Sequence, residues 1–524
     1  MRILFLPLVF VLSVGWATGQ PSVASVANAA SNAFPGLPNA PIAQGAMFVV
    51  YGTGMGPDAL VQAGGFPLSV GLGGTSARVV VSGSPVDAVM IYTSGKQIAA
   101  VLPSTTPVGT GTIAVTYNGQ TGASAPITVV AGNFGIFTVN QAGSGSGIVT
   151  YPDYALVSFD KAANPAETLL IWGTGLGPVK GDEATGPLPG NLAGVPVEVF
   201  VGGKPAAVTY RGRSGCCAGL DQIAFIVPDG ITGCSVPLAV KIKDLVSNFA
   251  SVAVATNGRV CPNTFGPLVA NPFSRLPVIG AVELVRYGDS TPTADYGSAS
   301  FSQTAHMPFL ANAVPVGACT VTTSVGQVGI GIPCFGTPSE ALGAGSAITI
   351  AGPIGNRTLA KACQLSTEST YYAELGNATP GNYLDTGTYT ITGPGGAGIG
   401  GFSVSITVPP ALAWTNLPST VTLVRADGQL ITWTGGDPQG IVEIAGTGYV
   451  RLAEGRFVSA DFTCRSKVSD GSFTVPSFVL SALPPGSGSL AISSSTTPQQ
   501  FTATGLDLGL ARSSVQIYRS VTYR

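Results

Sequence analysis

Ionisable side chains are scarce in this chain. Only 9% of its 524 residues are Asp, Glu, Lys or Arg, and His306 is the single histidine. The 23 basic residues nearly balance the 25 acidic residues, so no basic surface is available to displace counterions from a phosphate backbone. We therefore expect no nucleic-acid partner and few long helices with a charged face.

The same scarcity limits the catalytic chemistry. A serine hydrolase needs a histidine beside a serine on a Gly-x-Ser-x-Gly turn, and no such motif accompanies His306. A glycosidase needs two facing carboxylates, whereas the acidic residues are scattered. We predict no catalytic residue and no cofactor, and we interpret the carboxylates as turn caps or solvated surface groups. Those considered are Glu183, Asp221, Glu283, Asp289, Asp295, Asp437 and Glu443.

The spacings that metal sites require are missing too. The cysteines form no Cys-x-x-Cys pair and have no neighbouring histidine, as zinc would need. The segment from Asp289 to Asp295 lacks the alternating Asp/Asn pattern and the closing Glu of a calcium-binding loop. We therefore expect no metal site, and we expect the eight cysteines to form structural disulfides, as in exported proteins. They are Cys216, Cys217, Cys234, Cys261, Cys319, Cys334, Cys363 and Cys464.

The one long apolar run of the sequence lies at the N-terminus. Met1-Arg2 is followed by the apolar residues 3–16 and then by the small residues 17–19. This pattern predicts a secretory signal peptide over residues 1–19. The run is shorter than the roughly 20 residues of a membrane span. We expect a secreted or cell-surface protein with no membrane span after cleavage.

Glycine, by contrast, is abundant, and it marks a repeat. Val50-Tyr51-Gly52-Thr53-Gly54-Met55-Gly56-Pro57 returns as Ile171-Trp172-Gly173-Thr174-Gly175-Leu176-Gly177-Pro178. Glycine-rich turns also bind phosphates, but no Lys-Ser or Lys-Thr closes this motif and no helical pattern follows it. We interpret each copy as a strand that runs into a tight turn.

The repeat extends well beyond the glycine turn. Residues 97–103 reappear at 222–228 and residues 125–130 at 250–255, both shifted by 222 − 97 = 125, whereas Gly52 to Gly173 is a shift of 121. Short strands with a period of two fill each copy. They predict two tandem immunoglobulin-like β-sandwiches, at 40–131 and 160–262, with residues 20–40 as a leader. An expanded loop at 211–221 of the second copy carries its first two cysteines.

These motifs carry a family resemblance. The order of strand, Gly-Thr-Gly-x-Gly-Pro, a later Gln-Ile-x-x-x-x-Pro and a closing strand resembles the IPT/TIG group of immunoglobulin-like domains. The stretch at 216–223, with Val246-Ser247-Asn248-Phe249, is more closely similar to an uncharacterised Ig-like repeat of secreted acidobacterial proteins. The resemblance covers about residues 40–262 and implies an Ig-like fold with no catalytic residues. The first copy departs from it by lacking cysteines.

Several cysteine pairings are possible, and the connectivity does not follow from the sequence. In the second copy, Cys216 or Cys217 would pair with Cys234 and the other with Cys261, while a vicinal Cys216–Cys217 bridge is a strained alternative. Farther along the chain, Cys319 with Cys334 and Cys363 with Cys464 is the simplest arrangement. We predict that thiol titration of the denatured, unreduced protein finds almost no free sulfhydryl. Several free thiols would contradict the disulfide interpretation.

The second half of the chain also has strand-like segments punctuated by turns. After a linker at about 266–276, they predict two further β-sandwiches, at 277–409 and 410–524. The expected fold class is therefore all-β, with tandem immunoglobulin-like β-sandwich domains.

Aromatic side chains beside polar loops offer a route to ligand binding, because a flat ring can stack on a sugar if it is exposed. The candidates are Tyr371, Tyr372, Trp414 and Trp433, together with Tyr449 and Tyr518. In a sandwich, large aromatics at strand positions also fill the core, and the sequence leaves both roles open for them.

Two functions are compatible with these features. The first is a non-enzymatic secreted Ig-like protein that acts in adhesion, in envelope structure or in binding an extracellular polysaccharide or envelope protein. The alternative is an extracellular hydrolase, or its carbohydrate-binding accessory, with its site in residues 277–524. Acidic groups converging with exposed aromatics in one groove of that half would favour the alternative.

Overall fold

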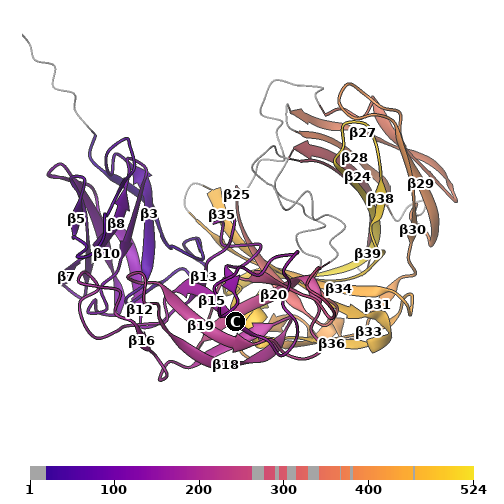
Figure 1. Ribbon diagram of the computed structural model, residues 1–524. Helices are drawn as coiled ribbons and strands as arrows, with labels where there is room; N and C mark the ends of the chain where they lie inside the picture. Colours follow the sequence, from indigo (N-terminus) through magenta and orange to yellow (C-terminus); the bar gives the residue numbers. More distant parts are fainter. Residues whose placement is uncertain are drawn as a thin grey trace, which may run out of the picture.

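The computed structural model describes residues 19–261, 277–288, 294–303, 314–327, 342–365, 368–377, 382–452 and 455–524. Almost all regular structure in these residues is β-strand, which confirms the predicted all-β class (Figure 1). The helical elements among them are one short helix, α2 (Ser477–Ser481), and the 3₁₀ turns η1 (Leu417–Ser419) and η3 (Val468–Asp470). No helix in this part of the chain has the length and apolar character to cross a membrane. The predicted signal peptide, apart from Gly19, lies outside the described residues.

The first unit is a sandwich of two sheets with strand orders β1-β3-β9-β8-β4 and β2-β12-β10-β6-β5. Its core lies between them and includes Phe48, Val79 and Ile113. Residues 20–40 were expected to be a leader, but they contribute β1, which pairs with β3 and so extends the sheet. The strands are β1 (Ser22–Asn28), β2 (Ile42–Ala43), β3 (Met47–Thr53), β4 (Val61–Gln62), β5 (Gly71–Leu72), β6 (Thr75–Val81), β7 (Ser84–Asp87), β8 (Val89–Thr93), β9 (Gln97–Val101), β10 (Gly109–Tyr117), β11 (Gln120–Thr121) and β12 (Ala125–Val130).

The second unit repeats the central pairing of the first. β15 precedes its glycine turn and pairs with β19, where Ile171 faces Ile223, as Val50 of β3 faces Ile98 of β9. The strands of this unit follow one continuous order, β13-β15-β19-β18-β17-β20-β21, and enclose a core that includes Ile171, Phe225 and Leu238. The strands are β13 (Gly135–Ile136), β14 (Val149–Thr150), β15 (Thr168–Thr174), β16 (Gly190–Asn191), β17 (Val197–Val201), β18 (Lys204–Arg213), β19 (Asp221–Ile226), β20 (Gly233–Ile242), β21 (Leu245–Val246) and β22 (Ala250–Val254).

The C-terminal half is built on one large sheet, ordered β25-β35-β34-β37-β39-β23-β24-β28-β27-β26-β29-β30. The strands are β23 (Val278–Gly288), β24 (Ala294–Gln303), β25 (Cys319–Gln327), β26 (Ala347–Gly352), β27 (Gly355–Leu365), β28 (Glu368–Asn377), β29 (Gly387–Gly393), β30 (Phe402–Val408), β31 (Leu412–Trp414), β32 (Thr422–Leu423), β33 (Gln429–Gly435), β34 (Ile441–Arg451), β35 (Arg456–Lys467), β36 (Ser472–Val475), β37 (Gly486–Ser495), β38 (Gln499–Phe501) and β39 (Leu508–Tyr523). A small sheet, β31-β33-β36, accompanies it.

The long strand β39 joins two hydrophobic cores. Ala511 and Val515 near its start belong to one core, whereas Val521 and Tyr523 near its end belong to the other. β39 pairs in parallel with β23, and β25 pairs with β35, so strands from the expected third domain lie in the sheet of the expected fourth. The division anticipated at residue 409 therefore does not separate two independent sheets. Figure 1 shows β39 curving from one lobe to the other.

The second unit packs against this half through aromatic rings. Phe478 of α2 stacks on Phe200 of β17 with ring centroids 4.0 Å apart, and it also contacts Phe249. Leu37 and Val246 join the same core. The interface is therefore a continuous apolar contact.

The described disulfides correct most of the expected pairings. Cys216 bonds to Cys217, so the vicinal alternative holds, and Cys234 bonds to Cys261. Cys319 bonds to Cys464, whereas Cys334 and Cys363 were their expected partners. The observed bond forms because β25 lies beside β35 with Cys319 and Cys464 directly opposite each other. Cys334 and the side chain of Cys363 lie outside the described residues.

Candidate functional site

Three of the six aromatic residues put forward as ligand contacts are buried. Tyr371, Trp414 and Trp433 point into the two cores of the C-terminal half, so for them the ligand-contact prediction is wrong. They occupy the inward positions of their strands, where large rings fill the space between sheets. Tyr372, the next residue after Tyr371, points to the opposite face and is 46% exposed.

Exposed tyrosines gather on the large sheet, on the face that points away from both cores. Core residues alternate with outward ones along each strand, as a period of two requires. On β34, Val442 and Ile444 point into the core and Tyr449 points outward. On β39, Val521 points into the core and Tyr518 points outward. Tyr449 is 36% and Tyr518 is 51% exposed.

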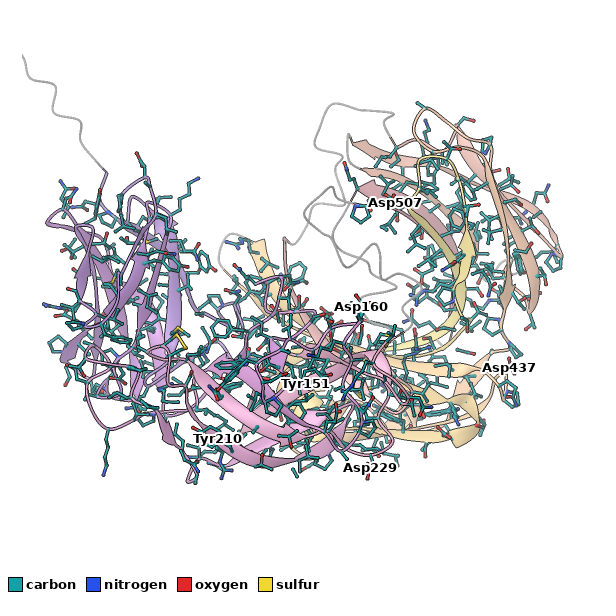
Figure 2. All side chains as sticks on the ribbon, viewed as in Figure 1. Tyr151, Asp160, Tyr210, Asp229, Asp437 and Asp507 are labelled. Carbon is teal, nitrogen blue, oxygen red and sulfur yellow. A yellow bond between two sulfur atoms is a disulfide. The ribbon has the colours of Figure 1, made fainter. Side chains whose placement is uncertain are left out.

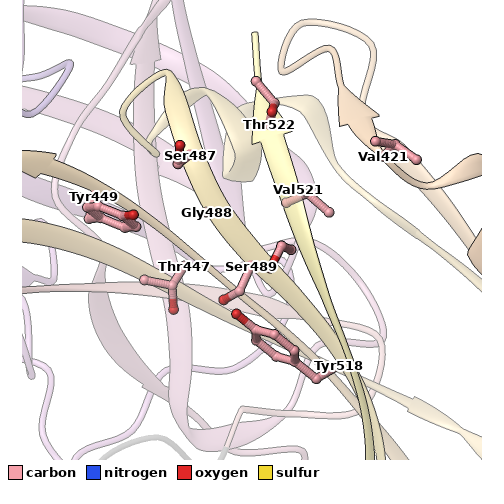
Figure 3. Close-up of a pocket in the computed structure, with 10 residues that line it drawn as sticks. Val421, Thr447, Tyr449, Ser487, Gly488, Ser489, Tyr518, Val521 and Thr522 are labelled. Atoms are coloured by element: carbon pink, nitrogen blue, oxygen red, sulfur yellow. The ribbon is translucent and has the colours of Figure 1, made fainter. Parts of the chain in front are cut away.

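A shallow hollow of about 500 Å³ lies between these two rings. Figure 3 shows Tyr449 and Tyr518 on either side, with the hydroxyls of Thr447 and Ser489 between them. Each lining residue is small, carries a hydroxyl group or carries an aromatic ring. These residues come from β34, β37, β39 and the position before β32. They are Val421, Thr447, Tyr449, Ser487, Gly488, Ser489, Tyr518, Ser520, Val521 and Thr522.

A carboxylate holds part of this hollow in place. Thr447 donates to Oδ1 of Asp461 at 2.6 Å, and Ser459 donates to Oδ2 at 2.8 Å. Both oxygens of Asp461 thus have hydroxyl partners. The hydroxyls on the open side of the hollow remain the groups best placed to meet a ligand, and each can both donate and accept.

Four charged residues on the same face neutralise one another. Arg512 of β39 lies 2.7 Å from Glu283 of β23 and 3.5 Å from Glu443 of β34. Arg465 of β35 lies 3.7 Å from the other oxygen of Glu443. Two arginines and two glutamates thus form one alternating cluster, each about a quarter exposed. The prediction that Glu283 and Glu443 are solvated groups therefore misses their ion pairs.

The glycine turn of the second copy is held by a buried ion pair. Asp221 Oδ2 accepts the N–H groups of Gly175 and Leu176 at 2.7 and 2.8 Å. Arg213 is paired with Oδ1 of Asp221 at 2.5 Å and donates to the carbonyl of Gly177 at 3.0 Å. Both side chains have no exposed surface. Burial raises the pKa of the Asp221 carboxyl, while Arg213 and the two amides act against this rise.

This turn also builds the junction between the first and second units. Thr174 accepts the N–H of Met47 at 2.8 Å and donates to the carbonyl of Gly219 at 2.6 Å. Gly219 follows the cysteine pair, and a Cβ on it would come within 2.8 Å of Met47 Cγ. The expanded cysteine loop therefore has a structural role at a tightly packed junction.

The remaining carboxylates also prove to be structural. Asp437 caps its own turn by accepting the N–H of Gln439 at 3.0 Å, as predicted, and lies at the edge of the C-terminal half (Figure 2). Glu183 and Asp295 are buried, which the surface interpretation did not foresee. Glu183 accepts the N–H of Ser104 at 3.0 Å, and Asp295 pairs with Arg286 at 2.9 Å. Asp289 and His306 lie outside the described residues.

Across the described ranges, no group of three or more His, Cys, Asp or Glu side chains is arranged to hold a metal ion. Burial is the largest cause that raises the pKa values of Tyr287 and Tyr372; Glu283 adds to the rise at Tyr287, and Tyr296 and then Glu374 add to it at Tyr372. Their hydroxyls therefore stay protonated near neutral pH and can donate hydrogen bonds.

No family model and no curated protein matches this chain. The solved structure of the Bacteroides ovatus surface glycan-binding protein SGBP-B, in complex with a mixed-linkage heptasaccharide, is 12% identical over 87% of this chain and 97% of its own, with a TM-score of 0.16. The I9–I11 tandem of titin is 7% identical over 70% and 93%, with a TM-score of 0.13. Domains 5–6 of the S-layer protein SbsC are 15% identical over 45% and 100%, with a TM-score of 0.15. At these values the similarity concerns tandem β-domain organisation and carries no functional argument.

Proposed function

We propose that this chain is a secreted, non-enzymatic binding protein whose C-terminal half binds an extracellular polysaccharide. The observation that carries the proposal is the hollow between Tyr449 and Tyr518, where two exposed rings flank a floor of hydroxyl groups. A sugar has an apolar C–H face that can be buried against a ring, and hydroxyls that exchange hydrogen bonds with serine and threonine.

The charges beside the hollow support binding without catalysis. A glycosidase needs one carboxyl group that is free to protonate a leaving group and a second that faces it. Glu283 and Glu443 are engaged by Arg512, and both oxygens of Asp461 accept hydroxyl hydrogen bonds. The carboxylate oxygens beside the hollow are therefore already engaged by neighbouring side chains.

The N-terminal units act in this proposal as a rigid support. We assign them to the IPT/TIG-like immunoglobulin domains, because each runs a strand into the Gly-Thr-Gly-x-Gly-Pro turn and pairs it with the strand that begins Gln-Ile. The buried junction around Thr174 and the Phe200–Phe478 stack join these units to each other and to the sheet that carries the hollow.

Replacing Tyr518 with alanine tests the proposal. We expect Tyr518→Ala to weaken binding of a neutral polysaccharide by about tenfold or more, because an aromatic ring at the centre of a contact contributes upward of 1 kcal/mol. Binding of the mature protein to glucomannan, arabinoxylan, mixed-linkage glucan, dextran and polygalacturonate is measured by affinity electrophoresis and calorimetry. Reducing ends are assayed in parallel.

Tyr154→Ala is the matched control. Tyr154 is 64% exposed but belongs to the second unit, so its removal should leave binding unchanged. Failure of every neutral polysaccharide to bind, or equal binding by the Tyr518 and Tyr154 variants, would refute the proposed site. Hydrolysis abolished by one carboxylate substitution would refute the non-enzymatic function.

A further inference from the structure

The two tyrosines of the hollow belong to a longer row on the same face. Tyr287 of β23 is 39% exposed, Tyr372 of β28 is 46% exposed, and Tyr296 of β24 lies half-buried between them. Their inward neighbours belong to the core: Leu284, Ala299, Phe301 and Tyr371. Among the described residues, five tyrosines are at least 36% exposed, and four of them lie on this one sheet face.

Strand register places these rings on one diagonal. From Tyr518 to Tyr287, to Tyr296 and to Tyr372, each step crosses to the adjacent strand and shifts by two residues in the same direction. The pairs that define the steps are Tyr287 with Gln516, Tyr296 with Val285, and Tyr372 with Ser298. Diagonal neighbours on one face lie within reach of aromatic side chains. The ring centroids of Tyr287 and Tyr296 are 5.6 Å apart, and those of Tyr296 and Tyr372 are 5.9 Å apart.

The row is too long for a single sugar. It begins at Tyr449 on β34 and ends at Tyr372 on β28, and the strand order between them is β34-β37-β39-β23-β24-β28. Five interstrand spacings amount to roughly 24 Å across the strands alone, before the shift along them is counted. A ligand that contacts every ring must therefore be a chain of several units.

The charges along the row indicate which kind of chain. Arg512 lies between Glu283 and Glu443, and Arg465 contacts Glu443, so these four groups leave no net charge to attract a polyanion. Glu374, paired with Tyr296 and exposed, adds a carboxylate and no positive charge to this face. The other outward groups near the row include the hydroxyls and amide of Ser298, Ser489, Gln516 and Ser520. Such a surface matches an uncharged, polyhydroxylated polymer.

We propose that the tyrosine diagonal from Tyr449 to Tyr372 is one extended binding surface for a neutral polysaccharide chain, with Tyr287, Tyr296 and Tyr372 forming subsites beyond the hollow. This inference rests on the proposed function and adds to it the ligand's length and charge. Binding then strengthens with chain length until the ligand spans β34 to β28.

The experiment compares two variants and one control variant on two lengths of one ligand. The neutral polysaccharide that binds most tightly in the panel above is used intact and as its purified trisaccharide. We expect Tyr372→Ala to weaken binding of the polymer by about tenfold while leaving trisaccharide affinity unchanged, because a short ligand occupies the hollow alone. Tyr518→Ala should weaken both. Tyr154→Ala should weaken neither, and melting curves confirm that each variant is folded.

The outcomes separate the two proposals. If the trisaccharide binds as tightly as the polymer, or if Tyr372→Ala binds the polymer like the unmodified protein, the extended surface is refuted while the hollow stands. If polygalacturonate binds more tightly than any neutral polymer, the inference about charge is refuted. If neither length binds in a Tyr518-dependent way, the proposed function itself fails.

Discussion

Replacing Arg213 with methionine is expected to destabilise the second unit by about 3–5 kcal/mol, the usual cost of leaving one member of a buried ion pair without its partner. Asp221 would keep its two amide donors from Gly175 and Leu176 but lose its counter-charge in a site with no exposed surface. The carbonyl of Gly177 would lose its donor as well. Urea unfolding followed by intrinsic fluorescence measures the loss, since Trp172 lies on the strand that enters this turn.

An exposed pair provides the control for this effect. Arg78 and Asp87 form a bidentate contact on neighbouring strands of the first unit, with 62% and 37% of their side chains exposed. Water screens such a pair, so Arg78→Met should change stability little. If the Arg213 and Arg78 variants unfold at the same urea concentration, the buried pair does not hold the glycine turn.

Removing the Cys319–Cys464 bond, as Cys319→Ser with Cys464→Ser, is expected to cost about 4–5 kcal/mol in the C-terminal half. The bond closes a loop with a sequence separation of 145, so its loss returns a large conformational freedom to the unfolded chain. Within the described residues β25 has one strand neighbour, β35, and the bond ties these two strands together. Calorimetric unfolding measures the loss, and hydrogen exchange should rise first at β25.

The vicinal bond is the matched comparison. Cys216 and Cys217 are adjacent, so their bond closes no loop and its removal, as Cys216→Ser with Cys217→Ser, should cost far less. Equal stability of the two double variants would mean that the long-range bond contributes nothing through the unfolded state.

The sequence predicted only part of the candidate site. Tyr449 and Tyr518 were proposed as ligand contacts if exposed, and both are. Tyr371, Trp414 and Trp433 looked equally suitable but face the cores, because a shift of one residue along a strand reverses the side that a ring faces. The sequence did not indicate Tyr287 and Tyr296 as ligand contacts, because their proximity to Tyr372 depends on pairing between distant segments.

Local patterns in the chain determined the all-β class and the two N-terminal copies, because period-two hydrophobicity and glycine turns act over a few residues. Only the tertiary structure decided that β39 would cross two cores, that Cys319 would meet Cys464, and that four exposed tyrosines would share one face. Each of these depends on which strands pair across long stretches of chain. That choice is made by the burial of whole sheet faces, and no short segment encodes it.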